Sequence, residues 1–163
     1  MTDKYLWLED VVADKSIKWV KEKNNESINK LKGHLLFAEI EQNALEFLGT
    51  KDKIPYIEIH GEHVYNLWND DIHIQGIYRR TSLSEYLKNS PLWETILDLD
   101  KLSVSDNEKW ILRGFELNDD VSRALVFLSP GGSDANIMRE YNMQTYTFVT
   151  NGFFLPESKG YAQ

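Results

Sequence analysis

One pattern constrains the fold of this chain more than any other: four short β-type segments occur in series, and the series then occurs a second time. The segments alternate apolar and polar residues or are rich in β-branched residues, and turn residues separate them. Gly61-Glu62 and Pro130-Gly131-Gly132 are examples of the joints, which favour tight antiparallel turns. The first series covers residues 56–60, 64–68, 77–81 and 94–99, and the second covers residues 110–113, 123–128, 135–141 and 147–150.

A repeated unit of four antiparallel strands predicts β-propeller blades. We therefore expect a mainly β chain with a partial β-propeller over residues 51–163, with blade one at about 54–100 and blade two at about 108–152. A small β-sandwich is the alternative. Because a propeller closes with about 4–8 blades, we expect either that the chain is a piece of something longer, or that the helices and another molecule cover the open faces of the two blades.

Residues 1–50 have a different pattern and predict an N-terminal arm followed by a helical hairpin. Apolar residues recur every three or four positions in two stretches, and lysines fill most of the other face of the first stretch. Asp14 is the expected N-cap of the first helix and Gly33 its C′ residue. The apolar stripes are Ile17, Val20, Ile28 and Leu31, then Phe37, Ile40, Ala44 and Leu48, with Gly49 ending the second helix.

Composition excludes several function classes. The chain holds 18 Lys or Arg against 26 Asp or Glu, a formal charge of −8, which argues against nucleic acid as a partner. There is no Cys, so disulfides, thiolate nucleophiles and Cys-based zinc sites are excluded. The N-terminus lacks the pattern of a signal peptide, and no apolar run approaches the ~20 residues that span a bilayer. We expect no membrane partner and a cytoplasmic location.

The stretch Gly131-Gly132-Ser133-Asp134-Ala135 nearly matches the nucleophile elbow of α/β-hydrolases. An elbow needs a helix after the Ser, whereas residues 135–141 alternate like a strand. The last histidine of the chain is His73, so no base follows Ser133 in the order that the hydrolase fold requires. We assign Ser133 to a hairpin turn.

Other candidate sites are no stronger. His60 and His63 flank a probable turn and could approach one metal ion, but no carboxylate accompanies them at a recognisable spacing. Gly131-Gly132 lacks the Lys and the following helix of a phosphate loop. We therefore predict no catalytic, cofactor-binding or metal-binding residue. His34 and His73 are the other histidines of the chain. We interpret the carboxylate pairs Glu9/Asp10, Asp98/Asp100 and Asp119/Asp120 as solvated charges in loops and at strand ends.

Two motifs near the start allow the chain to be compared with a known family. They are Tyr5-Leu6-Trp7-Leu8-Glu9-Asp10 and Trp19-Val20-Lys21-Glu22-Lys23-Asn24. Together they resemble the entry segment of the prolyl oligopeptidase family of serine peptidases, although Lys4 stands where the family usually has Pro. The stretches 52–56, 64–68, 76–81, 93–100 and 128–135 are similar to a bacterial branch of the same family.

The resemblance implies a two-part enzyme: an α/β-hydrolase domain that carries Ser, Asp and His, and a seven-bladed propeller that admits only short peptides. Such enzymes cut after proline or, in a related branch, after basic residues. The matched region covers the helical arm and about two blades, and it contains none of the catalytic positions. We expect the chain to be the inert N-terminal part of such a peptidase, with the hydrolase domain and short peptides as partners.

A stand-alone interaction module is the alternative function. Large apolar residues are numerous for so short a propeller segment, and exposed apolar patches usually mark interfaces. Unpaired strand edges add to the tendency to associate. We therefore predict that the isolated chain self-associates. The residues behind this expectation are Trp68, Trp93, Trp110, Phe127 and Phe148.

Overall fold

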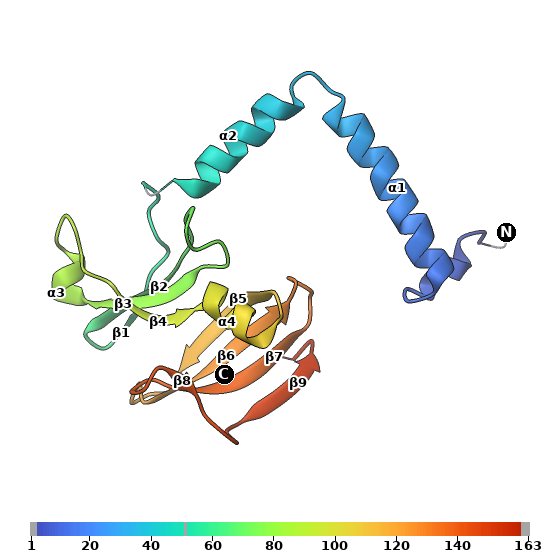
Figure 1. Cartoon of the computed structure of the whole chain (residues 1–163). Coiled ribbons are helices and arrows are strands. Elements are labelled where there is room, and N and C mark those ends of the chain that lie inside the picture. The colour runs from blue at the N-terminus through green and yellow to red at the C-terminus, as the bar shows by residue number, and fades with distance from the viewer. Residues whose placement is uncertain (1–2, 51, 161–163) are drawn as a thin grey trace. The chain divides into compact units, whose positions relative to one another are not determined.

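The computed structural model describes residues 3–50 and 52–160 of the chain. These residues divide into a helical unit that ends at Leu48 and a β unit that begins at Gly49 (Figure 1). No helix in the described residues is both long enough and apolar enough to cross a bilayer.

The helical unit contains the 3₁₀ helix η1 (Leu6–Glu9) and the helices α1 (Asp14–Lys32) and α2 (Phe37–Gly49), so both predicted helices are present. The expected N-cap is wrong by one residue, because Ala13 occupies the N-cap position, without a side-chain capping bond, and Asp14 is the first helical residue. At this first helical position, the Asp14 carboxylate still interacts favourably with the positive end of the helix dipole. Gly33 does end α1, but as a C-cap with φ −74°, not as a left-handed C′ residue.

An aromatic contact and a hydrogen bond hold η1 against the start of α1. Trp7 meets Trp19 edge to face with ring centroids 6.1 Å apart, and the Ser16 hydroxyl donates to the Trp7 carbonyl at 3.2 Å. The apolar stripes of the helices stay open to solvent: Ile17, Val20, Ile28, Leu31, Ile40 and Leu48 are between 40% and 66% exposed. Within the helical unit, these stripes therefore contribute little buried apolar surface.

The first sheet, which we call blade one, has the antiparallel order β1-β2-β3-β4. Its fourth strand carries a bulge, because the register with β3 shifts between Tyr78 and Arg79 and leaves Ile96 without an opposite residue. The short helix α3 (Leu83–Tyr86) follows β3, and the Ser82 side chain caps it. The strands are β1 (Glu58–His60), β2 (His63–Trp68), β3 (Ile77–Ser82) and β4 (Glu94–Asp98).

The second sheet, blade two, has five strands, one more than predicted. β7 pairs with β8 through Tyr141 and Asn142, and with β9 through Asn136, Met138 and Arg139, so its outer edge carries a strand in two pieces. The predicted strand at 147–150 stops at Phe148, and β9 was missed. The strands are β5 (Trp110–Leu117), β6 (Arg123–Pro130), β7 (Asn136–Asn142), β8 (Thr147–Phe148) and β9 (Phe154–Ser158).

One hydrophobic core lies between the two blades, as the side-by-side sheets of Figure 1 indicate. The Tyr78 ring of blade one stacks on Phe115 of blade two with centroids 4.1 Å apart. The connection is the helix α4 (Leu99–Asp106), whose first residue we had placed in a strand. Asp98 ends the strand there, because its side chain accepts the Lys101 N–H and caps α4. Two sheets that share a core through their faces are the packing expected of neighbouring blades.

Candidate functional site

Ser133 lies in the turn between β6 and β7, and a strand follows it as predicted. Its hydroxyl donates to the Ala135 carbonyl at 3.0 Å, and its own carbonyl accepts from Ser129 Oγ and from the Arg113 guanidinium. These bonds fix a hairpin. They do not resemble a hydroxyl presented to a histidine at the head of a helix.

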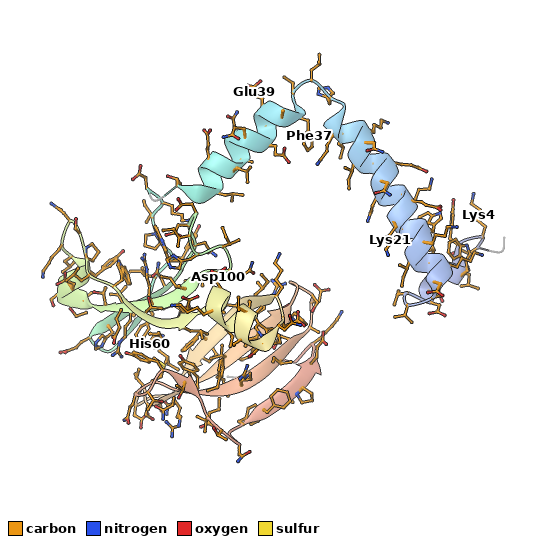
Figure 2. All side chains as sticks on the ribbon, in the orientation of Figure 1. Lys4, Lys21, Phe37, Glu39, His60 and Asp100 are labelled. Carbon is orange, nitrogen blue, oxygen red and sulfur yellow. The ribbon has the colours of Figure 1, made fainter. Side chains whose placement is uncertain are left out.

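The four histidines lie in three different places: His60 and His63 share the β1–β2 hairpin, and His73 and His34 each lie elsewhere. His60 and His63 face each other across the β1–β2 hairpin, where both rings contact Tyr65 (His60 is labelled in Figure 2). His73 Nδ1 lies 3.0 Å from Asp70 Oδ1, and His34 Nδ1 accepts the Leu36 N–H between α1 and α2. No group of three or more possible metal ligands is found within residues 3–50 and 52–160.

Three of the carboxylates that we interpreted as solvated charges accept backbone N–H groups. Two of them, Asp98 and Asp100, are only partly exposed, so the interpretation was wrong for these two. Asp98 caps α4, and Asp100 (labelled in Figure 2) accepts the Gln75 N–H with both oxygens, at 3.1 and 3.2 Å. In blade two, Asp120 accepts the Ser122 N–H in the β5–β6 turn. Glu9 ends η1 and Asp10 accepts the Ala13 N–H through its carbonyl.

The loop between β2 and β3 is organised around Asp70, whose side chain is 9% exposed. Burial by itself would raise the pKa of this carboxyl, but hydrogen bonds from the His73 N–H, the Trp68 indole, the Ile72 N–H and the His73 ring outweigh it and hold the pKa well below its ordinary value. The carboxylate is therefore the hydrogen-bonding centre of the loop.

A cation–aromatic sandwich lies beside this loop. The Arg79 guanidinium is 4.2 Å from the centroid of the Trp68 ring and 4.3 Å from that of Trp93, and its Nε donates to Asn66 Oδ1. Burial lowers the pKa of Arg79 to about 10, so the group stays charged at neutral pH. The sandwich explains why two Trp residues lie partly exposed on one sheet face without forming an open apolar patch.

A cavity of about 400 Å³ opens at the seam between the blades, and we call it the seam pocket. Tyr78 forms part of its wall, with its hydroxyl 3.5 Å from Glu58 Oε2. Burial raises the pKa of Tyr78, and the Glu58 carboxylate adds to the shift, so this hydroxyl remains a neutral donor. The lining residues are Tyr56, Glu58, Asn66, Leu67, Asn69, Tyr78, Leu112, Arg113, Gly114 and Phe115.

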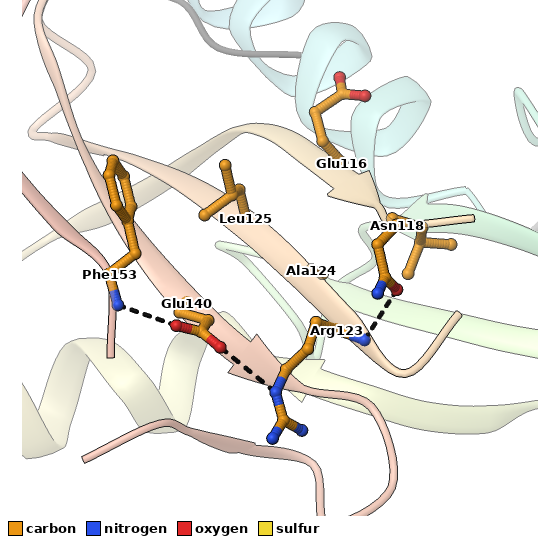
Figure 3. Close-up of a pocket in the computed structure, with 8 residues that line it drawn as sticks. Glu116, Asn118, Arg123, Ala124, Leu125, Glu140 and Phe153 are labelled. Atoms are coloured by element: carbon orange, nitrogen blue, oxygen red, sulfur yellow. Dashed lines mark hydrogen bonds and ion pairs between the residues drawn. The ribbon is translucent and has the colours of Figure 1, made fainter. Parts of the chain in front are cut away.

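A second cavity, of about 300 Å³, lies on the face of blade two that does not pack on blade one (Figure 3). Glu140 is its polar centre: one carboxylate oxygen accepts the Phe153 N–H at 2.9 Å and the other lies 3.2 Å from Arg123 Nε. Leu125 and Phe153 supply apolar wall, and Phe153 is 50% exposed. Leu125, Glu140 and Phe153 together form a mixed apolar and charged surface, which we call the open face of blade two.

Sequence reasoning missed both cavities for a common reason. The seam pocket joins residues of β1 and β5 that lie more than 50 positions apart, since it contains both Glu58 and Arg113. Strand alternation had indicated which residues share a face, but not which faces meet. β1 begins at Glu58, two residues later than predicted. Pro55 was a weak signal of this late start, because it lacks the N–H that a strand ladder needs.

Comparison with known proteins shows which proteins share this architecture. A family model described as the prolyl oligopeptidase N-terminal beta-propeller domain matches residues 1–162. A protein of Sinorhizobium fredii described as the uncharacterized peptidase y4nA is 35% identical over 97% of the chain. A Rickettsia prowazekii protein described as the uncharacterized peptidase RP174 is 33% identical over 90% of it. The chain spans about a fifth of these relatives, 22% and 20% of their lengths.

Two solved structures share the fold. A post-proline cleaving enzyme from Rickettsia typhi matches 91% of the chain with a TM-score of 0.83 and 32% identity, and the match covers 22% of that enzyme. A structure from a study of two prolyl endopeptidases matches 91% of the chain with a TM-score of 0.69 and 15% identity, over 21% of its length. The second likeness concerns the fold alone.

Proposed function

We propose, from the premise that this chain belongs to the prolyl oligopeptidase N-terminal β-propeller family, that it forms the arm and first two blades of a serine peptidase that cleaves short peptides after proline. In this proposal, the chain performs no bond chemistry itself. The nucleophile, acid and base belong to an α/β-hydrolase domain outside the matched region.

The observation that carries the proposal is the seam between the blades. Each sheet is built from one contiguous stretch of chain, and the two sheets bury a common core, as successive blades of a ring do. The family match extends over the same stretch and the helical unit together. The proposed specificity for proline rests on the similarity to the post-proline cleaving enzyme from Rickettsia typhi.

The proposed role of the blades is gating. A rigid lid over an active site narrows the route to the nucleophile and keeps bulk water away, which affects access and not the chemical step. The tight seam supports rigidity, because Tyr141 of blade two donates to the Ile96 carbonyl of blade one at 2.7 Å and Arg139 pairs with Asp106 at 2.9 Å. We also propose that the peptidase acts on short peptides in the cytoplasm.

A chromogenic peptide with proline before the leaving group tests the proposal. The 163-residue chain should give no turnover above buffer, and Ser133→Ala should behave identically. The polypeptide encoded by the complete reading frame should cleave the same peptide. Hydrolysis by the chain that disappears in Ser133→Ala, or a complete reading frame with no peptidase activity, would refute the proposal.

A stand-alone interaction module remains the second candidate, and one observation favours it. Phe153 and Phe154 are 50% and 58% exposed on the outer part of blade two, next to the open face. The residues that first suggested this function are less available, because Trp110 and Phe127 are buried at 8% and 2% exposure. We propose that the isolated chain self-associates through the open face. Sedimentation velocity should show concentration-dependent association that Phe153→Ser weakens, and a monomer at all concentrations would contradict it.

A further inference from the structure

We propose that the seam pocket, together with the unpaired edge of β2, binds an extended peptide that carries a cationic group near Glu58. The site is the juxtaposition of the free edge at residues 66–68 with the Tyr78–Phe115 stack and the Glu58 carboxylate. The choice of a peptide as occupant rests on the proposed function, whose substrates are peptides.

The edge is free because β1 is short. β1 pairs with β2 only through Tyr65, Val64 and His63, whereas β3 pairs with β2 along its whole length to Trp68. Within residues 52–160, no strand lies against residues 66–68 on the side away from β3, and no backbone bond joins the 52–57 segment to them. Backbone groups along β2 alternate between its two sides, and the Leu83 N–H bond to the Glu62 carbonyl shows that residues 66 and 68 face β3. The free edge therefore offers the N–H and carbonyl of Leu67 for pairing.

Blade two shows what a filled edge looks like. Its first strand, β5, pairs with β6 from Trp110 opposite Pro130 to Leu117 opposite Ala124. In blade one, continuation of the β1 register would put Pro55 opposite Trp68, and the chain has left the sheet before that point, with Tyr56 98% exposed. A strand from another peptide can occupy the vacated position by β-augmentation.

The pocket beside this edge can take a side chain of an extended peptide that pairs with β2. A residue opposite Leu67 would share the face of Leu67 and Tyr78, where the aromatic stack and Leu112 supply an apolar wall. Asn66 also lines the cavity, is 3% exposed, and has an amide nitrogen without a hydrogen-bond partner in the described structure. Backbone pairing would give affinity, and the wall would give side-chain preference.

Charge complementarity decides the type of peptide. Glu58 is the carboxylate of the site, and its Oε2 lies 3.8 Å from His60 Nε2. The one guanidinium that lines the pocket, Arg113, donates to the Gly132 and Ser133 carbonyls at 2.9 and 3.1 Å. With a chain charge of −8 around it, the Glu58 end favours an ammonium group, from a lysine side chain or a peptide N-terminus.

The test uses the peptide acetyl-Lys-Thr-Val-Tyr-Val-Lys-amide, whose lysines at both ends suit either strand direction. Amide resonances of the ¹⁵N-labelled chain should shift at residues 66–68 and 112–115. A short edge predicts weak binding, with a Kd of roughly 0.1–1 mM. A peptide of the same sequence with alternate backbone nitrogens methylated should bind at least about tenfold more weakly, because it cannot complete the ladder. The version with Glu in place of both Lys should also bind more weakly.

Matched variants separate the charge from the fold. Glu58→Gln should weaken binding roughly two- to fivefold, as expected for an exposed ion pair. Glu62→Gln, in the turn of the same hairpin, should leave it unchanged. Equal binding of the methylated peptide, an unaffected Glu58→Gln variant, or shifts confined to other surfaces would overturn the proposal. Protection of the Leu67 N–H that rises with chain concentration and without peptide would assign the edge to a second copy instead.

The failure of this site and of the proposed function are distinguishable. Post-proline cleavage by the complete polypeptide without peptide binding at the edge would overturn the site and leave the function intact. Peptide binding at the edge, with no cleavage by the complete polypeptide, would overturn the proposed function and leave the site intact.

Discussion

Substitution of Tyr141 by Phe tests whether the two blades are one energetic unit. Tyr141 is 2% exposed, and its hydroxyl donates to the Ile96 carbonyl at 2.7 Å across the seam. Burial raises the pKa of Tyr141, so the hydroxyl is a neutral donor throughout the usual pH range. The acceptor belongs to the bulge residue of β4, which has no opposite residue in β3.

The magnitude follows from what the variant leaves behind. The ring and its edge-to-face contacts with Phe115 and Phe148, at 5.7 and 4.9 Å, are retained in Tyr141→Phe, so little apolar burial is lost. The buried Ile96 carbonyl loses its cross-seam donor, which costs about 1–3 kcal/mol. We expect the free energy of unfolding of the β unit to fall by that amount.

Urea denaturation followed by tryptophan fluorescence measures the change. The denaturant dependence of the unfolding free energy should stay the same, and only the midpoint should move. Tyr56→Phe is the matched control, because Tyr56 is 98% exposed and its variant should stay within about 0.5 kcal/mol of the wild type. Equal stability of the two variants, or separate transitions of the two blades in the wild type, would refute the shared-seam reasoning.

Three further outcomes are expected. Because the pKa of Asp70 is lowered in the folded state, its ionised form stabilises the fold above the ordinary carboxyl pKa of about 3.9, and that contribution is lost as the pH falls through the folded value. Asp70→Asn should therefore cost about 2–3 kcal/mol at pH 7 and less at pH 3 in urea titrations, and a cost independent of pH would contradict this. Gly152→Ala should lower stability by about 1–3 kcal/mol, since the added carbon would lie 2.8 Å from both Glu140 Oε2 and Val149 Cβ, and unchanged thermal unfolding would disprove that clash. Phe115→Ala, at a residue 6% exposed and stacked on Tyr78, should cost about 3–5 kcal/mol, and a calorimetric loss under 1 kcal/mol would mean that the seam relaxes around the cavity.

Local patterns in the sequence were sufficient for most of the strands. The segment from Val64 to Trp68 is rich in β-forming residues and is bounded by turn residues, and the structure extends it by a single residue to β2. The failures occur where a local pattern meets a competing local signal. Leu99 continues the apolar run of β4, but the Asp98 side chain caps the following residues as α4. Side-chain capping competes with strand pairing at such positions.

The outer strand of blade two failed for a different reason. β8 and β9 lie on the same edge of β7, and the residues between them leave the ladder around Glu140. There, the Glu140 backbone bonds to Val149 and Phe153, and its carboxylate takes the Phe153 N–H. The residue pattern of 147–158 does not reveal that β8 and β9 both pair with β7, because that pairing depends on the backbone groups that β7 leaves available.

Sequence by itself determined most of the elements of this protein, but not α4 or β9: strand alternation, turn residues and helical periodicity act over a few positions, and the repeat of the four-strand unit follows from them. Only the tertiary structure decided the seam, where Tyr141 reaches a carbonyl 45 positions away and where Glu58 and Arg113 line one cavity. The physical reason is that alternation assigns a side chain to a face of its sheet, whereas the choice of which faces bury each other depends on the shape and apolar area of both sheets together.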